Sequence, residues 1–444
     1  MQKEKSKDKK ENLIKKITHK FNKKNNNKNQ KSKKRTNITE KIKKKITFKE
    51  EKENNYSFKD VMIIMFFSLG LGFITCLSFV KIFSNGRDYI ALSKDLEKLV
   101  DTYYAIKDNY YGNLDKELLV DSAIEGMINA VGDSYTIYTD KDDTTSFVQT
   151  VSGIYDGIGC TVAVDLNKNI IVVDIFKDSP AEKSGLKVND IILKIDDNDF
   201  QDKTSTDMSN YITNSKNKEV KLLVKRNDEE KEIIVKREKI EIPYVDGEII
   251  TKDDNKIAYI NISLFSQTSN EQFKKVLTDL EKEDIKGLII DVRGNSGGYL
   301  SSVTDIASMF LKKGDILYQL QDEKGTTVKK DTTKEKRDYK VAVLVNKGSA
   351  SASEILASII KESYKGYVVG TNTYGKGTVQ QTTKLPDGSM IKYTTQNWLT
   401  PEGNWINEIG VTPTDIVELD ENYLNNPTRE NDTQLNKAIE LILK

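Results

Sequence analysis

Apolar residues are distributed unevenly along the chain and divide its N-terminal part into two stretches. Residues 1–60 are rich in Lys and Asn and show no sustained apolar period, so we expect this stretch to be disordered. Residues 61–80 (VMIIMFFSLGLGFITCLSFV) then form a run of 20 residues without a charge. As a helix this run would be about 30 Å long, which matches the apolar layer of a bilayer. The pattern predicts one transmembrane helix over 61–80.

Two other origins of an apolar run near the N-terminus fit the sequence less well. A cleaved signal peptide has a shorter basic region and small residues before its cleavage site, and the sequence has neither. A lipid-attached Cys76 would need a small residue before it, but Phe73-Ile74-Thr75 precede it. We therefore interpret 61–80 as a retained anchor.

Residues 81–150 show apolar side chains at helical spacing. This period predicts one helix over 88–110 and a second over 115–131. We interpret 81–150 as a helical stalk or dimerisation region, which makes a homodimer an expected assembly.

The pattern changes to short β-rich runs over residues 151–240. The predicted strands are 159–164, 170–175, 190–195, 220–225 and 232–236, and a short helix is predicted over 179–186. Several short strands separated by turn residues are typical of a small β-rich domain.

Apolar strands alternate with amphipathic helices over residues 241–420. The predicted strands are 256–262, 287–292, 341–345 and 367–369, and the predicted helices are 269–281, 301–311 and 353–361. This alternation predicts a layered α/β core. In the last segment, 421–444, a helix is predicted over 432–443.

The formal net charge of +1 conceals an uneven distribution of charge. Residues 1–60 carry 22 basic and 8 acidic residues, whereas the remaining 384 residues carry 47 basic and 60 acidic residues. The positive-inside rule places the basic stretch in the cytoplasm and residues 81–444 outside it. Lipid headgroups are then the expected partner of the basic stretch. A nucleic-acid partner is the alternative for such a tail, and we do not expect one.

The scarcity of His and Cys excludes several kinds of active site. The single histidine, His19, lies in the predicted cytoplasmic tail, so the exterior part would hold no Ser-His-Asp, Cys-His or His-ligated zinc site. Two cysteines, Cys76 and Cys160, are too few for a disulfide framework or a Cys-only zinc site. Cys160 has no basic neighbour that would make it a thiolate.

A partial phosphate-binding motif is the one nucleotide signal in the sequence. Residues 370–376 fit the GxxxxGK pattern, but Gly377 replaces the Ser or Thr that binds magnesium. The residues that follow are predicted to form a strand and not the helix that such a loop opens. We therefore expect no nucleotide, no metal and no cofactor.

Three segments rich in Gly or Ser follow predicted core strands, where the loops of α/β sheets usually build sites. They are Asp291-Val292-Arg293-Gly294-Asn295-Ser296-Gly297-Gly298, Lys347-Gly348-Ser349-Ala350-Ser351-Ala352-Ser353-Glu354 and Tyr374-Gly375-Lys376-Gly377-Thr378-Val379-Gln380. In this order they resemble the C-terminal processing (tail-specific) peptidases, which are serine peptidases with a PDZ module. Supporting motifs extend the resemblance over roughly residues 90–420.

The resemblance implies a fold and a set of catalytic residues. The fold would be a crotonase/Clp-like α/β protease core with an inserted N-terminal PDZ-like β-rich domain, a helical stalk and one transmembrane helix. The family's nucleophile falls on Ser351, its base on Lys376 and the residue that orients the base on Gln380. The family's oxyanion hole pairs the amide of Ala352 with that of Gly297 or Gly298, and the sequence leaves both glycines open.

The residues make this chemistry physically reasonable. Ser351 lies just before a predicted helix, whose N-terminus favours a developing oxyanion. Lys376 lies between two glycines, which we expect to let its amine approach the nucleophile. Without a histidine the amine must be neutral to accept the serine proton, so burial should depress its pKa.

The PDZ-like region suggests the class of substrate. Such modules hold an extended peptide against a sheet edge and bind its terminal carboxylate with backbone amides. Gly157, Ile158, Gly159 and Cys160 are the expected carboxylate-binding loop. The expected partners are the C-terminal tails of unfolded or partly folded proteins.

Each motif also has a structural explanation. Ser351-x-x-Glu354 is a capping box, Lys376 could be an exposed turn lysine, and the glycine-rich loop could be a tight turn. We interpret Asp291 and Arg293 as a scaffold ion pair. The main hypothesis is a membrane-anchored, extracytoplasmic serine endopeptidase with a Ser-Lys dyad. The rivals are a catalytically silent PDZ scaffold that binds protein C-termini and an acyl-CoA enzyme of the crotonase type.

Overall fold

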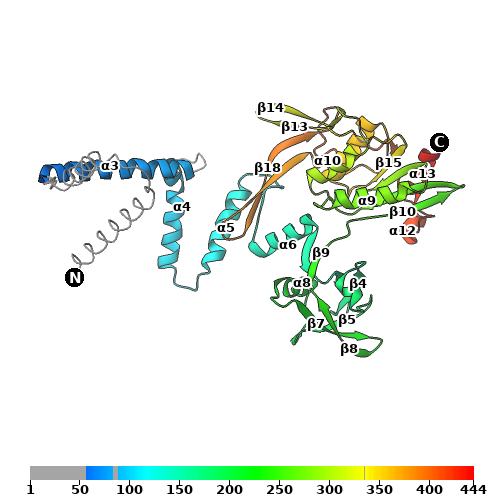
Figure 1. Ribbon diagram of the computed structural model, residues 1–444, viewed down its shortest axis with the longest axis horizontal. Coiled ribbons are helices and arrows are strands. Elements are labelled where there is room, and N and C mark those ends of the chain that lie inside the picture. The colour runs from blue at the N-terminus through cyan, green and yellow to red at the C-terminus, as the bar shows by residue number, and fades with distance from the viewer. Residues whose placement is uncertain (1–56, 84–88, 335) are drawn as a thin grey trace, which may run out of the picture. The chain divides into compact units, whose positions relative to one another are not determined.

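The computed structural model describes residues 57–83, 89–334 and 336–444, and the chain divides into two units, Met1–Leu114 and Asp115–Lys444 (Figure 1). Positions 1–56 of the expected tail, including His19, lie outside the described residues. The first unit contains helices α3 (Phe58–Phe83) and α4 (Tyr89–Asn109). Phe58–Thr75 of α3 is apolar and long enough to cross a membrane, and its side chains are exposed. The predicted helix over 61–80 lies within α3.

The second unit begins with α5 (Lys116–Asn129), whose N-terminus is capped by Asp115. The Asp115 carboxylate accepts hydrogen bonds from the backbone N–H groups of Glu117 and Leu118, which satisfies donors that have no acceptor within the helix. Both helices predicted after the apolar run are therefore confirmed as α4 and α5, while their role as a dimer arm stays a prediction.

A six-stranded sheet forms the centre of the second unit. Its order is β10 (Val245–Lys252), β11 (Asn255–Ile262), β12 (Gly287–Asp291), β15 (Lys340–Val345), β16 (Tyr367–Gly370) and β19 (Asp415–Ile416). β10 runs antiparallel to β11, and the strands from β11 to β19 are parallel. The four strands predicted for the core are thus confirmed, and they lie side by side.

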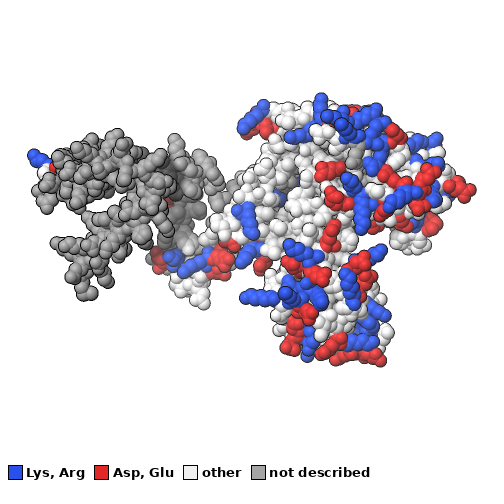
Figure 2. Space-filling model, in the orientation of Figure 1, with Lys and Arg blue, Asp and Glu red and all other residues white. Residues whose placement is uncertain are grey.

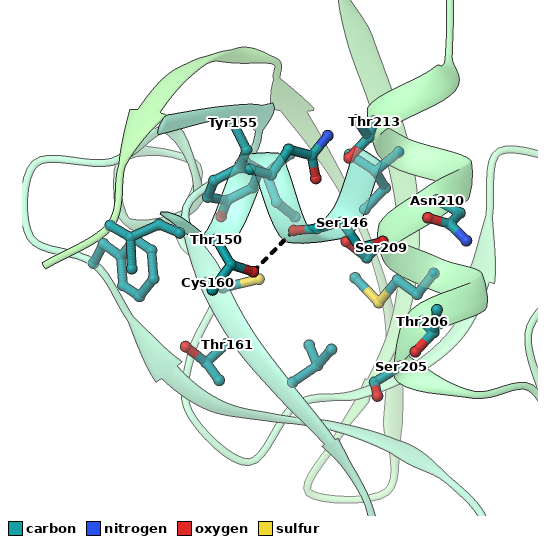
Figure 3. Close-up of a pocket in the computed structure, with 17 residues that line it drawn as sticks. Ser146, Thr150, Tyr155, Cys160, Thr161, Ser205, Thr206, Ser209, Asn210 and Thr213 are labelled. Atoms are coloured by element: carbon teal, nitrogen blue, oxygen red, sulfur yellow. Dashed lines mark hydrogen bonds between the residues drawn. The ribbon is translucent and has the colours of Figure 1, made fainter. Parts of the chain in front are cut away.

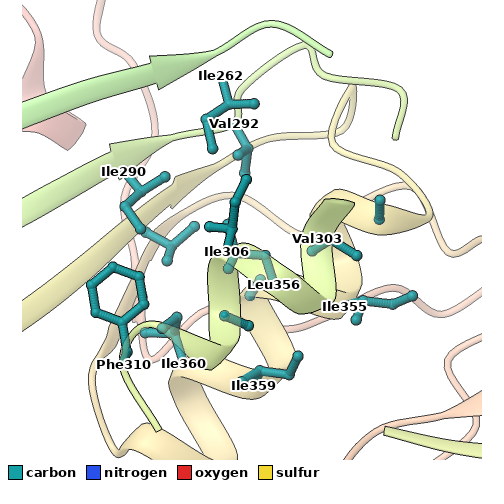
Figure 4. Close-up of a cluster of buried hydrophobic side chains, with 14 of the residues drawn as sticks. Ile262, Ile290, Val292, Val303, Ile306, Phe310, Ile355, Leu356, Ile359 and Ile360 are labelled. Atoms are coloured by element: carbon teal, nitrogen blue, oxygen red, sulfur yellow. The ribbon is translucent and has the colours of Figure 1, made fainter. Parts of the chain in front are cut away.

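Helices cover both faces of this sheet, which explains why its central strands β12, β15 and β16 are mostly apolar and buried. On one face, Ile290 of β12 packs with α10 (Leu300–Ser308) and α11 (Ala352–Ile359) (Figure 4). Leu288 and the helix α9 (Ser269–Glu281) belong to the same buried cluster. On the other, Ile289 packs with α13 (Thr433–Leu443). All four helices were expected from the sequence. Two short helical segments of this part of the chain were not expected from the sequence, namely α12 (Glu421–Asn425) and a π-helix, Ile360–Tyr364.

A buried ion network fastens α13 to the sheet. Arg293 Nη2 lies 2.6 Å from Asp291 Oδ2 and 2.8 Å from Asp432 Oδ2, and Tyr259 donates a hydrogen bond to Asp291. Asp432 also caps α13 by accepting from Leu435 N. The expected Asp291–Arg293 ion pair is therefore present, and it extends to a residue that sequence reasoning had not connected with it.

A second sheet lies in the same unit and was mostly missed by the sequence pattern. Its order is β1 (Ile137–Thr139), β18 (Met390–Leu399), β13 (Ile316–Asp322) and β14 (Gly325–Lys330), and β17 (Thr378–Lys384) also pairs with β18. Only β17 was predicted as a strand. The other four contain many polar residues, which conceal them from an apolar pattern.

The β-rich region contains a sheet of β3 (Cys160–Val164), β4 (Ile170–Ile175), β5 (Ile191–Ile195), β7 (Glu219–Arg226) and β8 (Glu229–Lys236), with β6 (Asn198–Asp199) beside β5. All five predicted strands and the short helix α7 (Pro180–Lys183) are present. Lys and Arg alternate with Asp and Glu over this region in Figure 2. Pairs such as Lys221–Glu232 join opposite charges across β7 and β8, as favourable cross-strand pairs do.

Four further elements border this β-rich region. They are helix α6 (Lys141–Ser152), helix α8 (Ser205–Asn214) and the two-stranded pair of β2 (Ile154–Gly157) and β9 (Glu238–Glu241). The sequence pattern predicted none of them. Capping side chains define both helices: Asp140 begins α6, and Thr204 forms a capping box with Asp207 at the start of α8.

Candidate active site

Three loops meet at one edge of the large sheet because they follow three neighbouring parallel strands. Residues 292–299 follow β12, 346–351 follow β15 and 371–377 follow β16, and the carboxyl ends of parallel strands lie at the same edge. Backbone hydrogen bonds join the loops, from Ala350 N to Asn295 O and from Tyr374 N to Ser349 O. The three segments singled out in the sequence therefore lie together.

Ser351 occupies the turn between β15 and α11 in a backbone conformation that is rare for a residue with a side chain. Its φ is 55° and its ψ is −113°, and positive φ at a non-glycine residue costs about 1–3 kcal/mol. A sharp, strained turn of this kind between a strand and a helix is also how some hydrolases expose a nucleophilic serine. Ala352 follows as the first residue of α11.

The Glu354 carboxylate joins the loop of Ser351 to the loop of Lys376. Glu354 Oε2 accepts hydrogen bonds from Ser351 N at 2.7 Å and from Lys376 N at 2.9 Å. The two backbone nitrogens therefore lie no farther apart than the sum of these distances. Glu354 Oε1 accepts from Gly375 N at 2.7 Å and from Thr373 Oγ1 at 2.6 Å. These donors compensate the burial of a side chain with no exposed surface.

The capping-box interpretation of Ser351-x-x-Glu354 explains one part of this arrangement. The hydrogen bond from Ser351 N to Glu354 is the one that a capping box provides. The bonds from Thr373, Gly375 and Lys376 come from a loop about 20 positions later, which no local motif predicts. Glu354 thus both caps α11 and holds the two loops together.

The side chain of Lys376 is partly buried, and its surroundings have opposing effects on its pKa. Burial lowers the pKa of the Lys376 amine and the nearby ammonium of Lys392 lowers it further, whereas Asp133 and Glu354 act to raise it. The net shift is downward, as expected for a lysine that serves as a base. The Lys376 Nζ lies 4.7 Å from the centre of the Tyr135 ring, and no described residue forms a hydrogen bond with this amine.

The backbone around Lys376 is held by two tryptophans. Trp398 Nε1 donates to the carbonyl of Lys376 at 2.7 Å, and Trp405 Nε1 donates to that of Gly377 at 3.0 Å. Trp398 is buried. The peptide unit next to the lysine is therefore fixed independently of its side chain.

The two flanking glycines allow a neighbouring stretch of chain to pack closely against the Lys376 loop. A Cβ on Gly377 would lie 2.7 Å from Asn407 N, and a Cβ on Gly375 would lie 2.9 Å from Ile409 N. The missing side chains thus make room for the backbone of residues 407–409 and, at Gly377, for the indole of Trp405. The sequence did not reveal this crowding, because the segments that cause it are distant along the chain, and the approach of the amine to the nucleophile stays a prediction.

The glycine-rich loop lies directly against Ser351, and its two glycines differ in their hydrogen bonds. A Cβ on Gly297 would lie 2.8 Å from Ser351 Cβ and 3.1 Å from Ala352 N. The N–H of Gly297 donates to Asn295 Oδ1 at 2.8 Å. In the described parts of the chain, no acceptor receives the N–H of Gly298 or that of Ala352.

Gln380 lies on β17 opposite Thr394 of β18. Its Nε2 donates to Thr378 Oγ1 at 2.9 Å and to Thr394 Oγ1 at 3.2 Å. Thr394 Oγ1 in turn donates to Asp133 Oδ2 at 2.6 Å. The amide nitrogen of Gln380 is therefore engaged by hydroxyl groups, which leaves its carbonyl oxygen as the group that can accept from a lysine amine.

A pocket of about 410 Å³ lies between β3 and α8 and is also lined by α6 (Figure 3). Ile158, Cys160 and Met208 contribute apolar surface, and Ser146 and Thr150 contribute polar groups from α6. Of the predicted carboxylate-binding residues, Ile158 and Cys160 line the pocket. Gly157 and Gly159 shape the loop instead, since a Cβ on Gly159 would lie 2.4 Å from Ser179 Cβ.

Cys160 behaves as a small apolar residue in this pocket. Burial and the nearby Asp174 raise the pKa of its thiol to about 12, so the thiol is protonated at neutral pH. This agrees with the expectation that Cys160 is not a reactive thiolate.

Sequence reasoning missed several residues around the candidate dyad. They are Asp133, Tyr135, Lys392 and Thr394, together with the role of Glu354 between the loops. The first two precede β1 and the next two lie on β18, a strand that was not predicted. No periodic pattern or motif marks them, because their contacts depend on the pairing of distant strands.

Comparison with known proteins gives three matches along the chain. Residues 256–417 match the model of peptidase family S41, residues 157–236 match that of the PDZ domain, and residues 80–143 match that of the N-terminal domain of the activating protease CtpB. The PDZ match contains most of the residues that line the pocket, and the peptidase match contains all three loops.

Individual proteins are also similar to this chain. The carboxy-terminal processing protease CtpB of Bacillus subtilis is 39% identical over 331 residues, which are 73% of this chain and 68% of that protein. A protein of Staphylococcus aureus named "Probable CtpA-like serine protease" is 35% identical over 322 residues, which are 72% of this chain and 64% of that protein. The solved structure of a photosystem II D1 C-terminal processing protease is 24% identical, with a TM-score of 0.44, and the match covers 75% of this chain and 88% of that one.

The Glu354→Gln substitution tests the link between the two loops. Both carboxylate oxygens accept from backbone N–H groups, so the new NH2 group must face a donor. We expect a loss of about 1–3 kcal/mol in the free energy of unfolding and faster amide hydrogen exchange at Gly375 and Lys376. Denaturant titration and exchange read by mass spectrometry measure the two effects.

Glu362→Gln is the matched control, because Glu362 accepts a single backbone hydrogen bond, from Glu402 N. It should leave exchange in residues 373–377 unchanged. Equal exchange in the two variants would show that Glu354 does not hold the loops together.

Proposed function

The chain belongs to peptidase family S41, the serine-type carboxy-terminal processing proteases, and from this premise we propose that it is a membrane-anchored endopeptidase that cleaves extracytoplasmic proteins from their C-terminal side by a Ser351–Lys376 dyad. The observation that carries the proposal is the shared Glu354 carboxylate, which holds the backbones of both residues. Burial of a carboxylate is costly, and two loops without a common function would not require one carboxylate to join them. This arrangement therefore supports a shared role for the two loops.

The proposed reaction is acyl transfer in two steps. The neutral Lys376 amine takes the hydroxyl proton of Ser351 as Oγ attacks the scissile carbonyl carbon. The resulting ammonium gives this proton to the leaving nitrogen when the C–N bond breaks, which leaves an acyl-enzyme. Water then attacks the ester carbon and gives a proton to Lys376. The ammonium passes this proton to Ser351 Oγ as the C–Oγ bond breaks, which releases the new carboxylic acid and restores the hydroxyl and the neutral amine.

The tetrahedral intermediates need hydrogen-bond donors for their oxyanion. We assign the amides of Ala352 and Gly298 to this role. Support comes from the hydrogen bonds, since the Gly297 N–H already donates to Asn295 whereas the amides of Ala352 and Gly298 have no acceptor within the described residues. Gly297 would contribute by admitting the backbone next to Ser351, where a Cβ would collide.

The amine of Lys376 must move between two positions in this proposal. It lies over the Tyr135 ring in the structure, and rotation about its four-carbon side chain would bring it to the Ser351 hydroxyl. Gln380 would orient the amine by accepting one of its N–H groups, so that the lone pair of nitrogen faces the serine.

Capture of the substrate is assigned to the pocket between β3 and α8. An extended tail would add to the edge of β3 and place its carboxylate at Gly157-Ile158-Gly159-Cys160. The apolar lining by Ile158 and Met208 supports an apolar last residue. Unfolded or partly folded protein tails are therefore the proposed partners, and no cofactor or metal takes part.

The domain organisation that we propose follows from these assignments. Residues 1–60 form a cytoplasmic tail, 61–80 an anchor, 81–150 a stalk or dimerisation region, 151–240 the PDZ domain, 241–420 the protease core and 421–444 a C-terminal helix. Support for the anchor comes from the exposed apolar helix α3. A homodimer and an extracytoplasmic catalytic domain remain part of the proposal.

Replacement of either dyad residue tests the reaction. In the full-length protein, Ser351→Ala and Lys376→Ala should each lower the rate of casein cleavage by about 10³-fold or more, and Ser351→Ala should abolish labelling by a fluorophosphonate. Lys347→Ala, which removes an exposed lysine of the loop before the nucleophile, is the control. Undiminished cleavage by either dyad variant would leave the PDZ scaffold as the function.

The pH dependence of the rate tests the assignment of Lys376 as base. Since only the neutral amine accepts a proton, the rate should rise with pH through the depressed pKa of Lys376. Lys392 helps to lower that pKa, so Lys392→Met should raise it and move the rising limb to higher pH. Lys384→Met, at an exposed site of β17, should leave the limb in place, and a limb that stays fixed in Lys392→Met would contradict the assignment.

A charge at the rim of the pocket tests the capture of tails. Ser209 of α8 is exposed and lines the pocket, so Ser209→Glu would place a negative charge near a bound carboxylate. We expect KM to rise about fivefold, as a repulsion of about 1 kcal/mol would produce, with kcat unchanged. The probe is an unstructured peptide that ends in apolar residues with a free carboxylate.

Two controls accompany this measurement. Asn214→Glu adds the same charge at the end of α8, outside the pocket, and should leave KM unchanged. The amidated form of the peptide should be cleaved equally by both variants. Equal KM values for the free peptide in Ser209→Glu and Asn214→Glu would exclude this pocket as the site of capture.

A further inference from the structure

A short segment between α5 and β1, Asp133-Ser134-Tyr135-Thr136, lies at the candidate base although it is far from the protease core in sequence. It falls within the match to the N-terminal domain, residues 80–143, and outside the peptidase match, residues 256–417. The pairing of β1 with β18 brings it there, because Ile137 lies opposite Lys392. Thr136 continues the contact by accepting a hydrogen bond from Thr394 N.

The Asp133 carboxylate is the centre of this segment. Its Oδ2 accepts hydrogen bonds of 2.6 Å from Thr136 Oγ1 and from Thr394 Oγ1, and its Oδ1 accepts from Tyr135 N at 3.0 Å. Burial alone would raise the pKa of Asp133, but these hydrogen bonds and Lys376 lower it below its ordinary value. Asp133 is therefore ionised at neutral pH.

The negative charge of Asp133 fixes the direction of a chain of hydrogen bonds. An ionised carboxylate can only accept, so the Thr394 hydroxyl must donate its proton to Asp133. The lone pairs of the same hydroxyl then receive the N–H of Gln380. The amide of Gln380 is thereby held with its nitrogen toward Thr394 and its carbonyl oxygen free to accept from an amine.

Tyr135 acts on the lysine directly. Its ring lies 4.7 Å from Lys376 Nζ, within the range of a cation–π contact, which favours the charged amine. The ring also covers the amine in a partly buried position, and burial favours the neutral form. Tyr135 thus contacts the candidate base, Lys376. Asp133, through Thr394, orients Gln380, the residue that is to position this base.

We propose that the segment Asp133–Thr136 belongs to the active site: Asp133, through Thr394, sets the amide orientation of Gln380, and Tyr135 holds the amine of Lys376 in its waiting position. Asp133, Tyr135 and Thr394 are positioning residues, since they act through Lys376 and Gln380. The proposal rests on the proposed function, in which Lys376 is the base.

Four groups determine how the Lys376 amine responds to pH. Asp133 precedes β1, Tyr135 lies two residues later, Lys392 is on β18 and Glu354 is on α11. Asp133 and Glu354 favour the ammonium, and Lys392 opposes it. Removal of the Asp133 charge should therefore lower the pKa of Lys376, which is opposite in sign to the effect expected for Lys392→Met.

The experiment measures the rate at which a fluorophosphonate labels Ser351 in the full-length protein, as a function of pH. Thr394→Val removes the hydroxyl that links Asp133 to Gln380 and should lower the labelling rate about 10- to 100-fold, the usual effect of a misplaced catalytic group. Thr394→Ser restores the hydroxyl and should recover most of the rate. Asp133→Asn should move the rising limb to lower pH.

Thr395→Val is the control, since Thr395 is the next residue on β18 and its hydroxyl makes only a 3.4 Å contact with Val379 O. It should label like the wild type. Thermal denaturation of every variant identifies any loss of folding. Misfolding alone would explain neither a rate recovered in Thr394→Ser nor a rising limb moved to lower pH in Asp133→Asn. Equal rates in Thr394→Val and Thr395→Val, or an unmoved limb in Asp133→Asn, would overturn the inference.

Failure of the proposed function has a different outcome in the same experiment. If the wild-type protein is not labelled at Ser351 at any pH, the dyad itself is wrong and the inference falls with it. If the wild type is labelled and its rate rises with pH, the dyad stands, and the variants of Asp133 and Thr394 alone decide the role of the segment.

Discussion

The candidate site depends on one buried carboxylate, that of Glu354, which receives the N–H groups of Ser351, Gly375 and Lys376. A charge without exposed surface is costly unless several donors surround it, and here the donors come from two loops that would otherwise be free to separate. The same contact keeps Ser351 in a positive-φ conformation, because its N–H must point at the carboxylate. The hydrogen bond from Ser351 N to Glu354 thus links the strained backbone of Ser351 to the buried carboxylate.

The sheet supplies the rest of the constraint. β12, β15 and β16 are parallel neighbours, so their loops must meet, and the apolar layers on both faces leave the strands little freedom to shift. The carbonyl of Asn295 accepts from Ala350 N and from Ser353 Oγ, which ties the glycine-rich loop to the turn that contains Ser351. The site is therefore assembled from hydrogen bonds that the loop backbones make with one another and with the buried side chains of Glu354 and Ser353, and the side chains of Ser351 and Lys376 are added to this frame.

The core elements could be predicted from the sequence because their signal is local. The strand over 287–291 is apolar up to its last residue, Asp291, and the helix over 269–281 has a clear amphipathic period, so both follow from periodicity. β18 could not be predicted in this way, since its middle residues, 392–397, are mostly polar and its register comes from pairing with distant strands. For the same reason Asp133 and Thr394 stayed unseen, although they form a hydrogen bond across 261 positions. Which glycine amide is free for the proposed oxyanion hole, that of Gly297 or that of Gly298, likewise depends on which of them donates to Asn295. No sequence pattern contains this information.

Lysine as a base imposes a requirement that a histidine base does not. Its ordinary pKa lies far above neutrality, so the protein must keep the amine partly buried and yet give it partners when it is charged. In this chain burial and Lys392 act in one direction and Asp133 and Glu354 in the other, which places the control of the amine on elements from widely separated parts of the sequence. The segment with Asp133 continues through β1 into α6, whose Ser146 and Thr150 line the pocket beside β3. One continuous stretch of chain therefore contacts both the candidate base and the pocket proposed to hold substrate tails, and any account of the rate must include this stretch together with the protease core.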